Sequence, residues 1–128
     1  MKELVFFKCN NCGNVVVKLV DKKTKLLCCG EEMLELKANS QDAAQEKHMP
    51  VVNVEGNLVK VSVGSVSHPM ADEHFINFIV LETTNGYKVA NLTPQNSPEA
   101  VFVLAENEKP INVYEYCNLH GLWMQNIK

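Results

Sequence analysis

Short runs in which hydrophobic and polar residues alternate occupy most of the chain, and this pattern is typical of β-strands. Between Leu58 and Val63, for example, three valines alternate with Lys60 and Ser62 at a period of two. Six such runs, separated by turn residues, are VVNVE, NLVKVSV, FINFIVLETT, YKVANL, AVFVLA and INVYEY. Because no long amphipathic helix accompanies them, they predict an all-β domain, an antiparallel β-sandwich.

Turn residues place two hairpins in this sandwich. A Glu-Gly-Asn turn at 55–57 separates the first two strands, and the Asn-Gly pair at 85–86, which favours a type I′ turn, separates the next two. We expect His74 to open the third strand and Cys117 to close the last one. A turn at 120–121 follows Cys117.

The first part of the chain, residues 1–36, is expected to form a separate compact unit. Its β-prone runs are ELVFFK and NVVVKLV, and DKKTK is a charged turn. A unit of this size cannot bury a self-sufficient core, so it needs a metal or a disulfide as a staple. A polar linker follows, with one helical turn expected at 42–45 and with Pro50 ending any helix. We therefore predict two domains, at 1–36 and 37–128.

Composition narrows the class of protein. Apolar residues make up 46% and charged residues 21% of the chain, as in soluble globular proteins. No apolar run reaches the roughly 18 residues of a membrane span, and no secretory signal is present, so we expect a cytoplasmic protein without membrane association. The net charge is −3 and all basic residues are lysines. Without a basic stripe and interleaved aromatic residues, we expect no nucleic-acid partner.

Four of the five cysteines lie in the first thirty residues. Cys9 and Cys12 form a C-x2-C knuckle, in which a turn lets two thiolates face one ion. Cys28 and Cys29 are adjacent, and adjacent Cα atoms lie about 3.8 Å apart. This is close to the sulfur separation in a tetrahedral site with metal–sulfur bonds of ~2.3 Å. Adjacent cysteines can therefore share an ion if the backbone leaves strand geometry, which Gly30 permits.

Several chemistries fit these four thiols. Thiolate-only tetrahedra suit zinc or iron, and the spacing fits structural zinc and mononuclear iron equally well. A redox disulfide between Cys28 and Cys29 is a further alternative, as is an inert role in a core.

All four histidines lie in the second part of the chain or at its edge: His48, His68, His74 and His120. A single histidine in a β-domain is more often a satisfied core or surface residue than a ligand. Here each has an unusual setting. Pro69 restricts His68 to an extended backbone, and His120 follows Cys117 by three residues, so a short loop can aim a sulfur and a nitrogen at one point.

Four imidazoles and one thiolate would be five ligands, whereas a structural zinc site is closed by four. Five ligands leave one position of an octahedron open. Imidazole and thiolate together suit iron or copper, and a thiolate opposite the open position increases electron density there. This donor set predicts a reactive site for a small, anionic, reducible substrate.

Two charged residues, Glu46 and Lys47, directly precede His48. Taken alone they are a solvated surface pair. Beside a ligated His48, the Lys47 ammonium would attract an anion and orient a proton-donating water, and Glu46 could cap the open position in the oxidised state. We interpret Tyr116 and Trp123, which flank the last cysteine, as packing residues rather than electron conduits.

These motifs together resemble the desulfoferrodoxin family, the two-iron form of superoxide reductase, over essentially the whole chain. The matching stretches are FKCNNCGN, CCGEEM, EKHMP, SVSHPM and EYCNLHG, of which the last is identical to the family pattern. No ligand position is missing, and the departures at Glu32, Met49 and Ser67 fall between ligands.

The resemblance implies two mononuclear iron sites. A desulforedoxin-like iron would be held by Cys9, Cys12, Cys28 and Cys29. A second iron would have four equatorial histidines and an axial cysteine, namely His48, His68, His74, His120 and Cys117. The resemblance also implies an immunoglobulin-like sandwich and reduction of superoxide to hydrogen peroxide without oxygen release. Lys47 and Glu46 would be the catalytic pair beside the iron, the protein a homodimer, and a rubredoxin-type protein the electron donor.

Two other functions are compatible with the residues. The chain would be a non-catalytic electron carrier if only the four-thiolate iron mattered. It would be an interaction module if zinc merely stapled the first domain.

Overall fold

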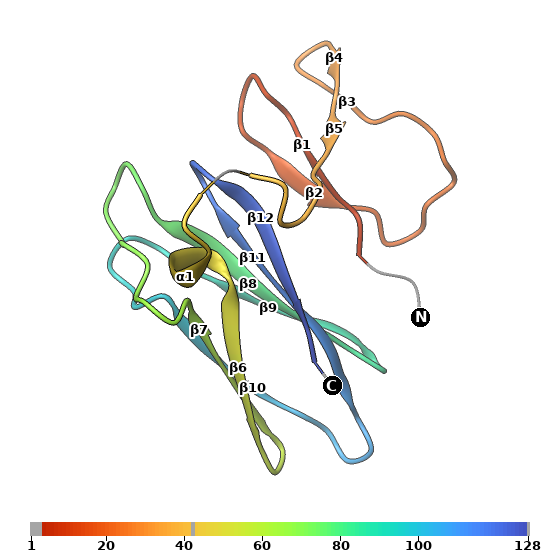
Figure 1. The fold of residues 1–128 in the computed structure, drawn as a ribbon. Coiled ribbons are helices and arrows are strands. Elements are labelled where there is room, and N and C mark those ends of the chain that lie inside the picture. Colours follow the sequence, from red (N-terminus) through yellow and green to blue (C-terminus); the bar gives the residue numbers. More distant parts are fainter. Residues whose placement is uncertain (1–3, 42, 128) are drawn as a thin grey trace. The chain divides into compact units, whose positions relative to one another are not determined.

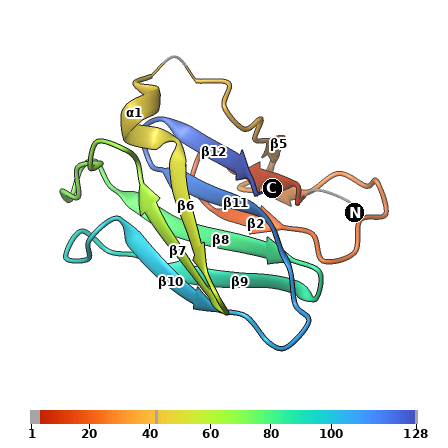
Figure 2. The same cartoon turned by 60° about the horizontal axis from the view of Figure 1, so that its bottom comes forward.

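The structure is a computed structural model that describes residues 4–41 and 43–127. The chain divides into two compact units, Met1–Lys37 and Ala38–Lys128, which are called unit 1 and unit 2 below. Short strands are the main regular structure in both units (Figures 1 and 2). Among the described residues, no helix has the length and apolar character needed to cross a membrane.

Unit 1 contains two small antiparallel sheets. Strand β1 (Phe6–Lys8) lies between β2 (Val15–Val17) and β5 (Leu34–Glu35), and β3 (Leu27–Cys28) pairs with β4 (Glu31–Glu32). The predicted strands around β1 and β2 are confirmed. The strands of the second sheet are two residues long, which is too short for a period of two to be recognised in the sequence.

Unit 1 has little hydrophobic core. Its buried apolar residues, among those the structure describes, are Phe6, Cys9 and Met33. Leu19 and Leu27 are more than two-thirds exposed. So few buried side chains cannot offset the entropy lost by ordering the unit, and a cross-link through its cysteines is needed.

Unit 2 is a sandwich of two antiparallel sheets (Figures 1 and 2). The first has the order β10-β7-β6 and the second β12-β11-β8-β9. The strands are β6 (Pro50–Glu55), β7 (Leu58–Val63), β8 (Ile76–Thr83), β9 (Gly86–Asn91), β10 (Glu99–Val103), β11 (Pro110–Cys117) and β12 (Gly121–Asn126). The predicted all-β sandwich is confirmed, together with its six predicted strands.

Strand β12 was not predicted. It pairs with β11 from Gly121 opposite Cys117 to Asn126 opposite Asn112. Leu122 and Trp123 are consecutive and both buried, so the strand lacks the alternation that identifies the others.

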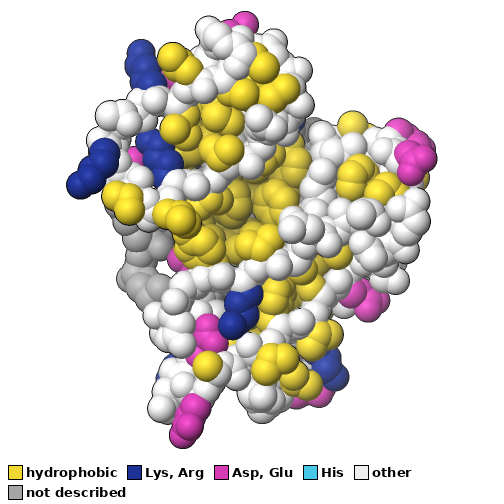
Figure 3. Space-filling model, turned by 180° about the vertical axis from the view of Figure 1, so that it is seen from behind, with side chains coloured by type: hydrophobic (Ala, Val, Ile, Leu, Met, Phe, Trp, Pro, Cys, Tyr) yellow, Lys and Arg dark blue, Asp and Glu magenta, His cyan; other side chains and the backbone are white. Residues whose placement is uncertain are grey.

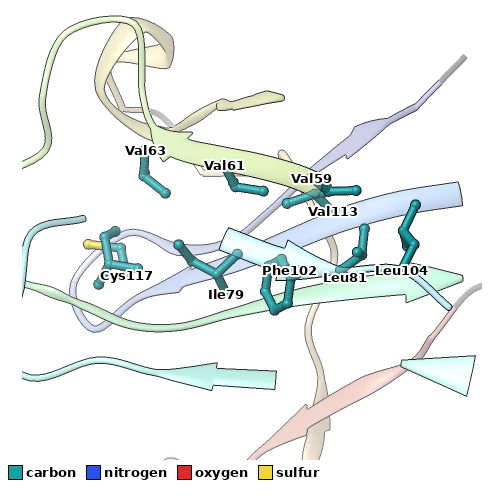
Figure 4. Close-up of a cluster of buried hydrophobic side chains, with 10 residues drawn as sticks. Val59, Val61, Val63, Ile79, Leu81, Phe102, Leu104, Val113 and Cys117 are labelled. Atoms are coloured by element: carbon teal, nitrogen blue, oxygen red, sulfur yellow. The ribbon is translucent and has the colours of Figure 1, made fainter. Parts of the chain in front are cut away.

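The core fills the space between the two sheets. Figure 4 shows β7 side chains above those of β8 and β11, with Val63 and Cys117 at the same end of the row. Ten buried side chains form this cluster: Val59, Val61, Val63, Ile76, Ile79, Leu81, Phe102, Leu104, Val113 and Cys117. The fifth cysteine is thus part of the core and marks one end of it.

Two local predictions about turns and strand ends were wrong. The second hairpin has its tip at Thr84–Asn85 and pairs Thr83 with Gly86, and Asn85 does not have the positive φ of a type I′ turn. The Thr83 hydroxyl accepts the Asn85 N–H at 3.1 Å, which stabilises this alternative tip. His74 forms an isolated bridge with Ala71, and β8 begins two residues after it.

The helical turn lies later in the chain than predicted. Helix α1 spans Gln45–His48, whereas the sequence suggested 42–45, where Asp42 lies outside the described residues. A tertiary contact explains the shift, because the Val66 N–H donates to the Glu46 carbonyl at 2.7 Å. Helix α1 leads directly into β6 (Figure 1).

Two valines on one sheet provide a test of this packing. Val61 is 1% exposed and Val101 is 60% exposed. We expect Val61→Ala to lower the free energy of unfolding of unit 2 by about 2 kcal/mol, since buried methyl groups are lost and a cavity remains. Val101→Ala should change it by less than about 0.5 kcal/mol. Equal effects in urea titrations of the two variants would contradict the assigned sheet faces.

Candidate metal centres

The first candidate centre gathers the four cysteines of unit 1. Their sulfur atoms all lie within 4.8 Å of one another, and Cys12 Sγ is 3.6 Å from Cys28 Sγ. The Gly13 N–H donates to the Cys9 carbonyl at 2.9 Å and closes the knuckle. The four cysteines are free thiols in the structure. The spacing therefore brings together the four sulfurs of one tetrahedral site.

The adjacent cysteines adopt the backbone geometry that the sequence predicted. Cys29 has a φ of 54° and Gly30 a φ of 75°, so the chain leaves strand geometry immediately after Cys28. The left-handed conformation turns the Cys29 side chain to the same side as its neighbour. A non-glycine residue adopts this conformation at an energetic cost, which a shared ion can offset.

The thiols of this centre differ strongly in acidity. A hydrogen bond from the Cys12 backbone N–H lowers the pKa of Cys9 to about 6. Hydrogen bonds from its own thiol to the sulfurs of Cys12 and Cys9 raise the pKa of Cys29 to about 12. Four crowded sulfurs cannot all ionise without a cation between them. The centre fits a thiophilic metal ion.

The second candidate centre gathers the four histidines of unit 2 at the end of the sandwich. The ring centroids form a four-membered circuit, His48–His68–His74–His120, with neighbouring separations of 4.7, 4.7, 5.1 and 4.9 Å. The rings of His48 and His74, on opposite sides of the circuit, are 6.5 Å apart. The four imidazoles therefore lie close together in one cluster.

Backbone hydrogen bonds decide which ring nitrogen faces the other rings. Nδ1 of His48 lies 2.8 Å from the Ala44 carbonyl and Nδ1 of His68 lies 2.6 Å from the Pro69 carbonyl, so both act as N–H donors. Their Nε2 atoms are left without protons and lie 3.2 Å apart. His120 faces His48 with its other nitrogen, since its Nδ1 is 3.2 Å from His48 Nε2. Such carbonyl partners orient metal-ligating histidines.

The last cysteine lies beside the same cluster. Donor atoms of His48, His74, Cys117 and His120 lie within 4.8 Å of one another. His68 lies outside this group of four but touches it through His48. Cys117 is fully buried, and burial raises the pKa of its thiol. Hydrogen bonds from the backbone N–H groups of Leu119 and His120 lower this pKa, but by less than burial raises it. The sulfur thus approaches the imidazoles from the protein interior.

The contacts among the histidine rings are unfavourable unless a cation lies between them. Burial lowers the pKa of His48, His68 and His74, so the rings are held neutral. The unprotonated Nε2 atoms of His48 and His68 then point their lone pairs at each other, and the buried Nε2 of His74 has no hydrogen-bond partner. Buried polar atoms without partners are costly. The residues present fit a transition-metal ion bound by imidazole and thiolate.

The predicted catalytic pair lies on α1, next to this centre. The side chains of Glu46 and Lys47 are exposed. The Lys47 ammonium contributes to the lowered pKa of both His48 and His74, which places its charge near the histidine circuit. Among the described contacts, Glu46 meets the site only through its backbone. Glu73, which sequence reasoning did not single out, raises the pKa of His74 against the effect of burial.

Trp123 is a further residue of this centre. Its ring stacks on His48 at a centroid distance of 5.0 Å, and its indole N–H donates to the His120 carbonyl at 3.1 Å. The side chain is 1% exposed. Trp123 is a packing residue, as the sequence suggested. It packs against His48, a candidate ligand, and no motif in the sequence indicates this contact.

Known proteins resemble this chain in sequence and fold. Residues 40–126 match the family model described as desulfoferrodoxin, and residues 2–36 match the one described as its N-terminal domain. A desulfoferrodoxin of Clostridium acetobutylicum is 44% identical over 98% of each chain. The crystal structure of the superoxide reductase from Treponema pallidum has a TM-score of 0.83 at 37% identity, covering 98% of this chain and all of that one. A superoxide reductase of Pyrococcus horikoshii is 33% identical over 75% of this chain and 98% of its own.

The fold and the donor sets define an all-β metalloprotein with two metal-binding sites, one of four cysteines and one of histidines and a cysteine. The two donor sets match those of a two-iron protein. The chain belongs to the desulfoferrodoxin family.

Trp123 allows a test of how the histidine centre is oriented. Trp123→Phe keeps a ring beside His48 but removes the N–H that holds the His120 carbonyl. We expect about tenfold weaker ferrous iron binding at this centre, in a competition with a chelator, and an unchanged four-cysteine centre. Tyr114→Phe removes another buried donor, whose partner is Glu82, and should leave iron affinity unchanged. Equal affinities of both variants and the parent would exclude the orienting contact.

Proposed function

We propose that this chain is a superoxide reductase, which converts superoxide, one electron and two protons into hydrogen peroxide without releasing oxygen. One observation carries the proposal. The rings of four histidines lie close together, and a buried sulfur lies beside them. Among the described residues, no further donor completes a closed set with them. Relatives named superoxide reductase share the fold.

The donors that would hold the catalytic ion are His48, His68, His74, His120 and Cys117. Iron bound there supplies the single electron that superoxide must receive. Cys117 makes the centre electron-rich, because a thiolate donates more electron density than an imidazole does. Its position in the core keeps water away from the sulfur, so that a small molecule reaches the centre from the side of His74 and His120, which are only partly buried.

Lys47 is the residue we assign to substrate capture and proton delivery. Its exposed ammonium lies near two of the histidines and attracts a small anion, although the chain as a whole has a net charge of −3. The same group can orient a water molecule that donates a proton to the reduced substrate. Glu46, its neighbour, is assigned to capping the centre in the oxidised state.

A reductase of this kind consumes one electron per turnover, so an external donor must resupply it. We propose a rubredoxin-type protein as the donor and the cytoplasm as the compartment, where thiols stay reduced. In this proposal the domain at 1–36 carries an iron held by Cys9, Cys12, Cys28 and Cys29, and the domain at 37–128 carries the reaction.

We also propose that the protein is a homodimer. Hydrophobic side chains are visible on the molecular surface in Figure 3. Exposed apolar side chains of unit 2 include Tyr87, Val89, Val101 and Val103. Exposed apolar side chains of this kind support association with a second copy of the chain.

The reaction itself gives the first test. Ferrous protein mixed with a pulse of superoxide should consume one superoxide per histidine centre and release one hydrogen peroxide, with no oxygen. Oxygen release at half the amount of superoxide consumed would indicate a dismutase instead. His48→Ala should abolish the reaction while the four-cysteine iron remains. If His48→Ala kept the full rate, the chain would be an electron carrier or a binding module.

The role of Lys47 gives the second test. We expect Lys47→Ala to lower the second-order rate constant with superoxide about tenfold at low ionic strength and to weaken its dependence on salt. Lys47→Arg keeps the charge and should retain most of the rate. Lys60→Ala is the matched control, because Lys60 is paired with Glu55 on the outer face of its sheet. Identical rates for Lys47→Ala and Lys60→Ala would remove Lys47 from the capture step.

A further inference from the structure

Gly64 lies where the backbone of helix α1 meets the loop that follows β7. A Cβ atom added at Gly64 would lie 2.6 Å from the Glu46 carbonyl oxygen and 2.9 Å from the Lys47 carbonyl carbon. It would also lie 3.1 Å from the carbonyl oxygen of Met49. Carbon atoms pack at about 3.5–4.0 Å. These neighbours are main-chain atoms in and directly after one short helix, so none of them can rotate away as a side chain would.

The requirement for glycine here is steric. The other glycines of the described chain have a positive φ, and a Cβ atom added to them would meet open space or one flexible side chain. Gly64 has no positive φ, and its added Cβ atom would meet backbone. The residue is therefore needed for a close approach of two chain segments. This distinguishes it from the turn glycines, whose sequence context already explains them.

The loop from Gly64 to His68 connects two of the candidate ligands. The Val66 N–H and the Ser65 hydroxyl both donate to the Glu46 carbonyl, at 2.7 and 3.3 Å. At the other end of the loop, the His68 N–H donates to the Val63 carbonyl at 3.0 Å. The loop thus holds α1, which carries His48, and at the same time fixes the start of His68.

The loop from Gly64 to His68 begins at the end of the core where Cys117 also lies. Val63, the residue before Gly64, lies at the same end of the core cluster as Cys117 in Figure 4. The hydrogen bonds between this loop and α1 hold the Nε2 atoms of His48 and His68 3.2 Å apart. Any displacement of α1 relative to the loop changes that separation directly.

We propose that Gly64 is a positioning residue of the histidine centre, which sets the separation of His48 and His68 and through it the affinity and geometry of the metal. The proposal rests on the proposed function in that the bound metal is the catalytic one. A side chain at position 64 pushes α1 outward and carries His48 away from the other rings, together with the Lys47 ammonium. The four cysteines of unit 1 are unaffected, and they serve as an internal reference.

The test compares Gly64→Ala with the parent and with Gly56→Asn in the full chain loaded with iron. Gly56 lies in the β6–β7 turn with open space around it, and its φ of 60° is one that asparagine tolerates. We expect Gly64→Ala to weaken ferrous iron binding at the histidine centre about tenfold and to shift its thiolate-to-iron absorption band. The four-cysteine iron should keep its spectrum, and Gly56→Asn should match the parent in both centres.

A milder variant covers the case in which Gly64→Ala does not fold. Ser65→Ala removes one of the two hydrogen bonds to the Glu46 carbonyl, and we expect a smaller shift of the absorption band in the same direction. A parent-like affinity and spectrum in a folded Gly64→Ala protein would overturn the proposal. So would an unchanged Ser65→Ala spectrum if Gly64→Ala fails to fold.

Zinc binding to the same donors separates this proposal from the proposed function. Suppose that Gly64→Ala binds zinc more weakly than the parent and that the parent does not reduce superoxide. This result would support the role of Gly64 and contradict the proposed enzyme activity. If instead the parent reduces superoxide and the variant binds zinc and iron as tightly as the parent, the enzyme activity would be supported and the role of Gly64 contradicted.

Discussion

Both donor clusters depend on a bound metal ion. Their crowded donor atoms repel one another unless a cation lies between them. In unit 2, the unprotonated Nε2 atoms of His48 and His68 face each other at 3.2 Å, and a thiol whose pKa is raised by burial lies nearby. In unit 1, four sulfurs meet in the same way. Each cluster would be expensive without a cation, because desolvated polar atoms gain nothing from facing like atoms. Metal binding and folding are therefore linked in both units.

The sandwich provides the rigid support that such a cluster needs. The donors of the histidine centre come from five segments: helix α1, the loop after β7, the residues before β8, the end of β11, and the turn between β11 and β12. Each segment begins or ends on a strand of the core, so the well-packed interior fixes where the ligands can lie. The hydrogen bonds to the Ala44 and Pro69 carbonyls then select the ring nitrogen, and Trp123 holds the face of His48.

Sequence reasoning succeeded where the signal is local. The C-x2-C spacing and the adjacent pair before Gly30 describe one short-range cluster, and alternation identified six strands of the sandwich. It failed where tertiary contact decides. Strand β12 buries two consecutive side chains, α1 is placed by a hydrogen bond from Val66, and the role of Gly64 lies in an approach between segments with no periodicity. The residue types of the second centre were readable, but not their arrangement, because imidazole orientation is set by carbonyl groups that every residue carries.

The most direct measurement is a crystal structure of the iron-loaded protein with anomalous diffraction data collected at the iron edge. The account predicts two iron peaks per chain. One lies among the sulfurs of unit 1, and the other lies within bonding distance of His48, His68, His74, His120 and Cys117, with no sixth ligand from the protein in the reduced state. A second peak bound by fewer than these five residues, or no peak among the histidines of a fully loaded protein, would contradict it.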